Sequence, residues 1–143
     1  MHPELHLNYA AVAAAVIASF AFGALWYGPL FGKKWAELMG LKMENAKPAA
    51  WMFLLTLLGV FLTAYVIAHD VLIWRPSVWG LGEDQPDYMY GFFAGFFVWL
   101  GFYLPMLFGS VTWEGKPWKL FCLNATYHFL NLQIIAMILA NWR

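Results

Sequence analysis

The sequence predicts an all-α integral membrane protein, a four-transmembrane-helix bundle in which two helical hairpins repeat. Of the 143 residues, 63% are hydrophobic and 11% are charged, whereas an average soluble domain is about half apolar and roughly a quarter charged. So few charges are not enough to cover a water-facing surface. Four apolar stretches are each long enough to cross about 30 Å of hydrocarbon. We therefore expect a single membrane domain over residues 1–143, with the lipid bilayer as its surroundings.

The four expected spans are residues 8–31, 49–73, 88–112 and 120–142. Asp70 is the one acidic or basic residue within them. Backbone polar groups in lipid must be paired inside the membrane, so a span is either an α-helix or a strand of a closed barrel. The run from Phe92 to Phe97 does not alternate in polarity as barrel strands do. The spans are therefore expected to be helices.

The positions of lysine and arginine predict the orientation. Six lysines lie in or beside the loops 32–48 and 113–118, against two arginines, Arg75 and Arg143, on the opposite side. Because cytoplasmic loops are enriched in Lys and Arg, we expect both loops in the cytoplasm and both termini outside, in a bacterial inner membrane. Trp and Tyr collect at membrane interfaces, and most of them fall near the span ends, so they are interpreted first as anchors.

Two parts of the sequence repeat. The segment Tyr27 to Gly32 and the segment Tyr103 to Gly109 both read Y-x-P followed by L-F-G, with one insertion, and a Lys-Pro pair precedes the next span in each half. Both hairpins then have the same orientation. Parallel repeats occur in transporters, whose sites lie at the repeat interface. The alternative is a duplicated hairpin that only forms a stable bundle. Proline disrupts a helix, so helix breaks or a gate are expected at Gly28, Pro29 and Pro105.

The run from Gly23 to Trp35 contains the pattern W-Y-G-P-x-x-G-x-x-W. This pattern resembles the signature of an uncharacterised family of bacterial and fungal membrane proteins, domain of unknown function 1761. The resemblance covers nearly the whole chain. It implies a membrane protein with four spans, and it implies no particular catalytic residue.

Two groups of residues are candidates for packing and for a buried site. Small residues at intervals of four let helices approach closely, which predicts packing faces at Ala11, Ala15, Ser19 and Gly23 in the first span and at Gly91 and Gly95 in the third. The fourth span is the most polar, and Asn124, His128 and Asn131 share one of its faces. Polar groups at this depth face protein or a water-filled cavity. Thr63 and Ser19 come to similar depth and are their expected partners.

Other kinds of site have little support in the sequence. His2, His6, His69 and Asp70 are weak candidates for a metal site on the outer face, because imidazole suits Zn or Cu but no ligand spacing fixes a geometry. The alternative there is an ion pair between Asp70 and Arg75. The one cysteine, Cys122, excludes an internal disulfide. Eight basic residues balance eight acidic ones, so no basic face for nucleic acid is expected. We predict no resident metal and no cofactor.

Three functions follow from these patterns. The favoured one is a non-catalytic accessory or interaction subunit of a larger membrane assembly, associated with other membrane subunits or with copies of itself. The alternative is a small oligomeric transporter or channel that uses the polar face of the fourth span. A membrane enzyme, or a protein that binds metal at the outer face, is the third. No paired acids, nucleophile elbow or phosphate loop is present in the sequence, so we expect no enzyme.

Overall fold

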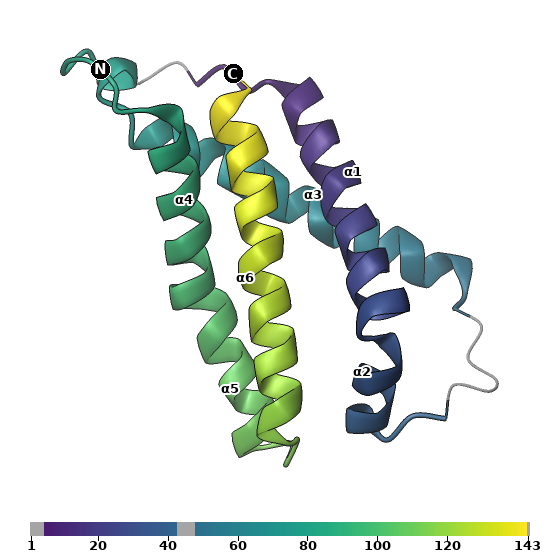
Figure 1. The fold of residues 1–143 in the computed structure, drawn as a ribbon. Helices are drawn as coiled ribbons and strands as arrows, with labels where there is room; N and C mark the ends of the chain where they lie inside the picture. Colours follow the sequence, from purple (N-terminus) through teal and green to yellow (C-terminus); the bar gives the residue numbers. More distant parts are fainter. Residues whose placement is uncertain (1–4, 43–47, 143) are drawn as a thin grey trace.

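The computed structural model describes residues 5–42 and 48–142, and this part of the chain is helical with no strand (Figure 1). The elements follow in the order α1 (Tyr9–Leu25), η1 (Trp26–Leu30), α2 (Gly32–Met39), α3 (Ala50–Ile73), η3 (Pro76–Trp79), α4 (Asp87–Val98), η4 (Trp99–Tyr103), α5 (Leu104–Thr112) and α6 (Trp118–Asn141).

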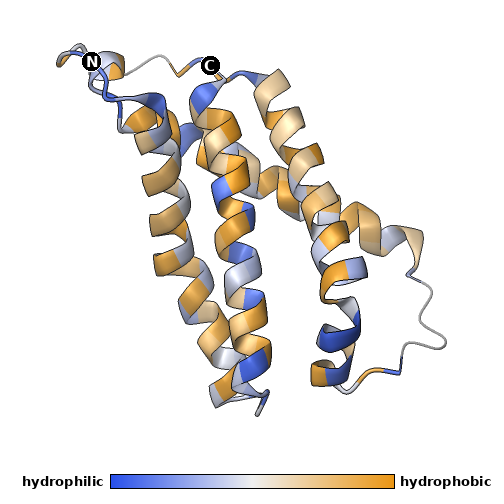
Figure 2. Cartoon of the chain, viewed as in Figure 1, coloured by the Kyte–Doolittle hydropathy of each residue, from blue (hydrophilic) through white to orange (hydrophobic). Residues whose placement is uncertain are grey.

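Four helical stretches are long and apolar enough to cross a membrane: Tyr9–Leu30, Ala50–Ile73, Asp87–Thr112 and Trp118–Asn141. They agree with the four expected spans to within two residues at each end. The all-α fold and the four-helix bundle are therefore confirmed. Figure 2 shows the hydrophobic residues that dominate all four spans, while polar residues recur along α6.

The starts of the spans follow from local sequence. The side chain of Asn8 accepts hydrogen bonds from the N–H groups of Ala10 and Ala11, which caps the first turn of α1. Pro86 and Pro117 stand immediately before α4 and α6. Proline cannot supply a helical hydrogen bond from its nitrogen, but that bond is not needed at a helix start. These residues place the helix starts close to where hydropathy alone puts them.

Helix α6 is the centre of the bundle. It packs against α1, α2, α3, α4 and α5, and in Figure 1 it stands between α4 and α1. The buried core is formed by small and branched residues of the four spans, among them Ala15, Ala64, Ala94 and Ile135. The start of α1 and the ends of α3 and α6 meet around Ala11, Ala68 and Leu139. Helices α1 and α6 are therefore antiparallel.

Helix α3 is only half packed. Its buried residues are Ala64, Ile67, Ala68 and Val71, all in its second half. In its first half, large apolar side chains are exposed around the helix, including Trp51, Leu54, Leu55 and Leu58. Figure 1 shows α3 crossing behind α1 and α6 at a steep angle to them. The two repeated hairpins are therefore packed differently, because the small residues that let α3 approach the core are confined to one half of it.

Both Y-x-P motifs lie at a π-helical segment. In η1 the N–H of Phe31 bonds to the carbonyl of Trp26, five residues earlier, over 2.8 Å, and Gly28 leaves helical geometry at φ −101° and ψ −107°. Segment η4 directly precedes α5, whose second residue is Pro105. Proline clashes with the carbonyl four residues back, and a wider turn relieves that clash. The first span is thus broken, whereas the third continues through its π-segment.

The second glycine of the first motif, Gly32, is required for steric reasons. A Cβ atom at Gly32 would collide with the carbonyl oxygen of Tyr27. The turn that follows the break brings these two backbones into contact, so only glycine fits there. This accounts for the glycine three residues after Pro29 in the pattern W-Y-G-P-x-x-G.

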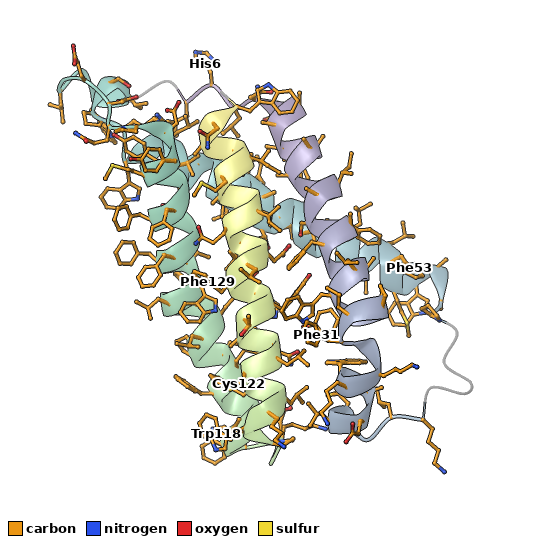
Figure 3. The ribbon with its side chains drawn as sticks, viewed as in Figure 1. His6, Phe31, Phe53, Trp118, Cys122 and Phe129 are labelled. Carbon is orange, nitrogen blue, oxygen red and sulfur yellow. The ribbon has the colours of Figure 1, made fainter. Side chains whose placement is uncertain are left out.

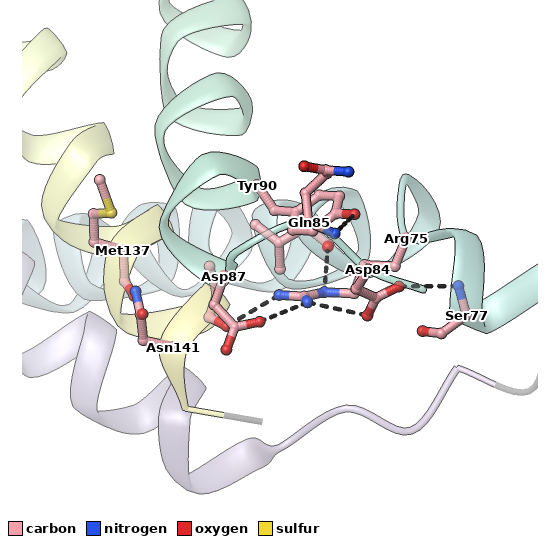
Figure 4. Close-up of polar contacts among 10 residues, drawn as sticks. Arg75, Ser77, Asp84, Gln85, Asp87, Tyr90, Met137 and Asn141 are labelled. Atoms are coloured by element: carbon pink, nitrogen blue, oxygen red, sulfur yellow. Dashed lines mark hydrogen bonds and ion pairs between the residues drawn. The ribbon is translucent and has the colours of Figure 1, made fainter. Parts of the chain in front are cut away.

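The ends of three spans are joined by Arg75, which is 1% exposed (Figure 4). Its guanidinium donates to Asp87 over 2.7 Å and to Asp84 over 3.4 Å. It also donates to the carbonyls of Val71 and Ala140, and it lies 4.3 Å from the ring centre of Tyr90. The alternative expectation of an ion pair between Asp70 and Arg75 is wrong, because Asp84 in the loop before α4 and Asp87 at the start of α4 bind the guanidinium instead.

Candidate functional site

The small residues expected to form packing faces lie against α6 or in the core. Ala11, Ala15 and Ser19 are buried. A Cβ atom at Gly23 would meet the hydroxyl of Tyr127 at 2.8 Å, and one at Gly95 would meet the Gln133 side-chain nitrogen at 2.8 Å. A Cβ atom at Gly91 would come within 3.0 Å of the Ala136 carbonyl oxygen. These glycines therefore let α1 and α4 approach α6 of the same chain.

The tyrosine of the first motif reaches the polar face of α6. Tyr27, in η1, donates a hydrogen bond from its hydroxyl to Asn124 Oδ1 over 2.9 Å. Its ring also meets the Trp35 ring edge-on at 5.7 Å. Both Tyr27 and Asn124 are partly buried. Tyr27 is thus part of the bundle interior, and its interpretation as an interfacial anchor does not describe its contacts.

The tyrosine of the second motif reaches the same face of α6 from the other side. Tyr103, in η4, has its ring 4.8 Å from the ring of His128. Its hydroxyl lies 3.3 Å from Thr63 Oγ1 on α3. Thr63 was an expected partner of the α6 face, and the structure connects it to His128 through Tyr103. The threonine hydroxyl also donates to the carbonyl of Gly59.

A third tyrosine, Tyr127, lies at the junction of these contacts. Its ring stacks on Phe22 at 5.6 Å with an interplanar angle of 7°, and it meets Tyr27 at 4.7 Å and His128 at 5.0 Å. Trp26, 8% exposed, packs against the same ring. We refer to Tyr27, Tyr103 and Tyr127 as the tyrosine cluster. It surrounds Asn124 and His128 with aromatic rings.

Two expected members of the polar site are buried without a hydrogen bond. Ser19 Oγ and Asn131 Oδ1 have no partner in the described part of the chain. Gly23 faces Tyr127, and α1 and α6 are antiparallel, so Ser19 and Asn131 stand at about the same level of the bundle. The structure therefore brings these two residues to one level but does not join them. An unmade bond at such a group costs about 1–3 kcal/mol.

The weak metal candidates that the structure describes, His6, His69 and Asp70, form no metal-ligand group. His69 Nδ1 lies 2.8 Å from the carbonyl of Tyr65, and Asp70 accepts from the indole of Trp74. His6 lies in the segment before α1, near Ala68 and Leu72 at the end of α3 and far from Trp118 and Cys122 (Figure 3). Within residues 5–42 and 48–142, no three His, Cys, Asp or Glu side chains are grouped as metal ligands. His2 lies outside the described residues.

The sequence pattern missed the three tyrosines and Arg75. The repeat is the available signal for Tyr27 and Tyr103, since both occupy the same place in the motif. The position of both tyrosines near span ends favours the anchor interpretation instead. Tyr127 carried no signal of its own beyond its place next to His128. Arg75 lies in a short loop where pairing depends on how the chain turns through η3, and the sequence does not specify that turn.

The site has hydrogen-bonding groups and aromatic faces but no acid–base pair. In the described contacts, Asn124 and His128 meet tyrosine side chains, and no carboxylate is in contact with them. Such a set can hold helices in register or bind a small polar group. A neutral imidazole can donate and accept a hydrogen bond at once. The arrangement is built from three helices and both π-segments, so a movement of either π-segment changes its geometry.

Four helices that are long and apolar enough to cross a membrane, with large apolar side chains exposed on their surface, define the chain as a multi-pass membrane protein. More particularly, it belongs to the family described as Protein of unknown function (DUF1761), whose model matches residues 10–140. The family resemblance of the W-Y-G-P motif is thereby confirmed. Neither the curated proteins nor the solved structures give a match to the chain.

Proposed function

We propose that this chain is a non-catalytic accessory or interaction subunit that binds a transmembrane helix of another membrane protein. The observation that carries this proposal is the uneven burial of α3. Its second half is packed in the core, while its first half exposes large apolar residues such as Leu54 and Leu58. A groove of about 480 Å³ runs between this half and α1, lined by Val12, Val16 and Leu57 among others.

A helix of a partner fits this groove better than an isolated lipid chain. One wall is α1, where Ala13 leaves space between Tyr9 and Ile17, and small residues allow close helix approach in membranes. The other wall is the first half of α3, which is not packed in the core of its own bundle. Association of this kind is driven by packing, because lipid is as apolar as the helices themselves. The proposed orientation places both termini outside and the lysine-rich loops in the cytoplasm of a bacterium.

Site-specific crosslinking in the native membrane tests this function. A photoreactive residue at Leu58 is expected to give one discrete adduct with another protein. The matched control is Met106, which is 64% exposed on α5 and is expected to crosslink to lipid. Equal patterns at the two positions would show that the first half of α3 is merely lipid-facing. Adducts of twice the chain mass would instead identify a second copy as the partner and remove the proposal of a different subunit.

A reporter fused after Arg143 tests the orientation separately. Activity on the outer side is expected, and a cytoplasmic signal would overturn the proposed topology without affecting the crosslinking result.

A second candidate function is transport by an oligomer through the face of α6. It is favoured by the convergence of both motif tyrosines on Asn124 and His128, together with the buried unpaired oxygens of Ser19 and Asn131. If this candidate is correct, His128→Ala and Asn131→Ala will each fail to restore the phenotype of a deletion strain. Full complementation by both variants, at wild-type protein levels, would rule it out.

A further inference from the structure

A second groove, of about 450 Å³, lies between α3 and α4 on a different side of the bundle from the α1–α3 groove. Its walls are almost entirely apolar and aromatic, with Phe93, Phe97 and Phe102 following one another along α4 and η4. Asp70 and Gln85 supply polar groups at one end, where α3 finishes and α4 begins. The groove therefore has a polar end and an apolar length, which is the pattern of an amphipathic ligand.

The charge at the polar end is a single carboxylate. Asp70 accepts a hydrogen bond from the indole N–H of Trp74 over 3.0 Å, and no ion pair to it is found within residues 5–42 and 48–142. The neighbouring cation, Arg75, is turned away to Asp84 and Asp87. A carboxylate at the head of an apolar groove attracts a positively charged group.

Aromatic faces beside Asp70 favour the same ligand charge. Trp74 and Phe93 line the groove near this carboxylate end, and a cation is attracted to the face of an aromatic ring. The ring of Tyr90, which also lines the groove, already carries the guanidinium of Arg75 at 4.3 Å. The rings of Trp74 and Phe93 are the ones that a bound cation would meet.

The dimensions of the groove indicate one alkyl chain. From Met89 to Phe102 the lining spans fourteen residues, which is roughly 20 Å along a helix. Half of the hydrocarbon core is about 15 Å, so a ligand with its head at Asp70 would extend to the middle of the membrane. A volume of about 450 Å³ is in the lower part of the ~300–1,000 Å³ range of small-molecule pockets. It suits a single chain better than a two-chain phospholipid.

We propose that the α3–α4 groove binds a single-chain amphipathic cation of the long-chain alkylammonium class. The ammonium group pairs with the Asp70 carboxylate beside Trp74, and the alkyl chain lies along Phe93, Phe97 and Phe102. This site is separate from the tyrosine cluster and from the proposed partner groove of α1 and α3. If the proposal of a partner helix fails, the proposal of the alkylammonium site is therefore unaffected.

Photolabelling of the full chain in phospholipid nanodiscs tests the site. The probe is hexadecylammonium with a diazirine in its chain, and the labelled peptide is identified by mass spectrometry. Label is expected on the segment 89–102, and unlabelled hexadecyltrimethylammonium should displace it whereas hexadecanol should not. Asp70→Asn is expected to reduce labelling about tenfold, in line with the loss of a charged hydrogen-bond partner. The control Glu83→Gln removes a carboxylate of the loop between α3 and α4 that does not line the groove, and it should leave labelling unchanged.

Thermal unfolding and a second variant separate a loss of binding from a loss of folding. Thermal unfolding shows whether Asp70→Asn is folded. If it is not, Gln85→Lys, which puts a competing ammonium at the groove end on an exposed side chain, is expected to reduce labelling in its place. Equal labelling by an uncharged hexadecyl probe, unchanged labelling in both variants, or a co-purified two-chain phospholipid retained equally by the wild type and Asp70→Asn would each overturn the proposal.

Discussion

The hydroxyl of Tyr27 donates a hydrogen bond to Asn124 Oδ1 over 2.9 Å, and this bond joins the broken end of the first span to α6. Hydrogen bonds between membrane helices contribute about 0.6 kcal/mol on average. Tyr27→Phe is therefore expected to lower the free energy of unfolding by about that amount, while Tyr9→Phe, at an exposed position, should have no effect. Reversible unfolding in mixed micelles measures both. If Tyr27→Phe loses more unfolding free energy than the double variant Tyr27→Phe/Asn124→Leu, the loss comes from the Asn124 amide that is left without a hydrogen bond.

Arg75 is expected to be the most sensitive charged residue. Arg75→Leu leaves Asp84 and Asp87 without their buried partner, and breaking a buried pair costs about 3–5 kcal/mol. Lys34→Gln removes an exposed pair with Glu37 and should cost less than about 0.5 kcal/mol. The comparison is made by thermal unfolding in detergent. Similar losses in the two variants would contradict the role of Arg75 in joining α3, α4 and α6.

Stability is expected to fall in acid because of Asp84. Burial alone would raise the pKa of its carboxyl. Hydrogen bonds from Ser77, together with the hydrogen bond and charge of Arg75, lower this pKa by more than burial raises it. The net pKa therefore lies below the ordinary value of 3.8. A pKa that is lower in the folded state stabilises the protein above the ordinary value, and this contribution is lost as the pH falls below it. The wild type should therefore lose more stability than Asp84→Asn when the pH is lowered from about 5 to about 3. Parallel pH profiles of melting temperature would refute this.

Gly95 is expected to tolerate no side chain. An added Cβ would stand 2.8 Å from the Gln133 amide and 3.1 Å from the Leu132 carbonyl, so Gly95→Ala forces α4 away from α6. Gly59, on the exposed half of α3, has nothing within 4 Å of an added Cβ. Gly59→Ala should be neutral or slightly stabilising, because alanine is the better helix former. Gly95→Ala should cost about 1–3 kcal/mol, as judged by the same unfolding assay.

Ser19 offers the opposite test. Its buried hydroxyl has no hydrogen-bond partner in the described part of the chain. Removing such a group relieves its desolvation cost, so Ser19→Ala is expected to be neutral or to stabilise the bundle by up to about 1 kcal/mol. Ala15→Ser, which adds a hydroxyl at a fully buried position, should destabilise it. A loss of stability in Ser19→Ala would show that the hydroxyl is bonded within the membrane.

The spans were predictable from the sequence, but the unequal packing of α3 was not. Hydropathy reports only how apolar a segment is, and it does not show which half of α3 packs in the core. What separates them is Ala64 and Ala68, two small residues that permit close approach, and their effect depends on the surface of α6 that they meet. The ion pairs of Arg75 were missed for a similar reason. Asp84 and Asp87 reach the guanidinium only because η3 folds the loop back onto the end of α3.

The polar face of α6 was predictable, whereas its partners were not fully so. Periodicity places Asn124, His128 and Asn131 on one side of a helix, and depth indicates that they face protein. Which side chains meet them depends on the π-segments, since these determine where Tyr27 and Tyr103 point. Proline in the motif predicted a disturbance at each site. It did not predict that the third span would pass through its disturbance without a break.

The π-segment of the third span also changes what a single helix can contact. One extra residue in a turn rotates everything after it by about 100° relative to a regular helix. Before η4, the span presents Gly91 and Gly95 to α6; within η4, Tyr103 meets both His128 of α6 and Thr63 of α3. Deleting one residue from Trp99–Tyr103 would bring the two parts into phase and direct the tyrosine elsewhere. The π-segment thus changes the helical phase within one span, which lets the same span contact both α6 and α3.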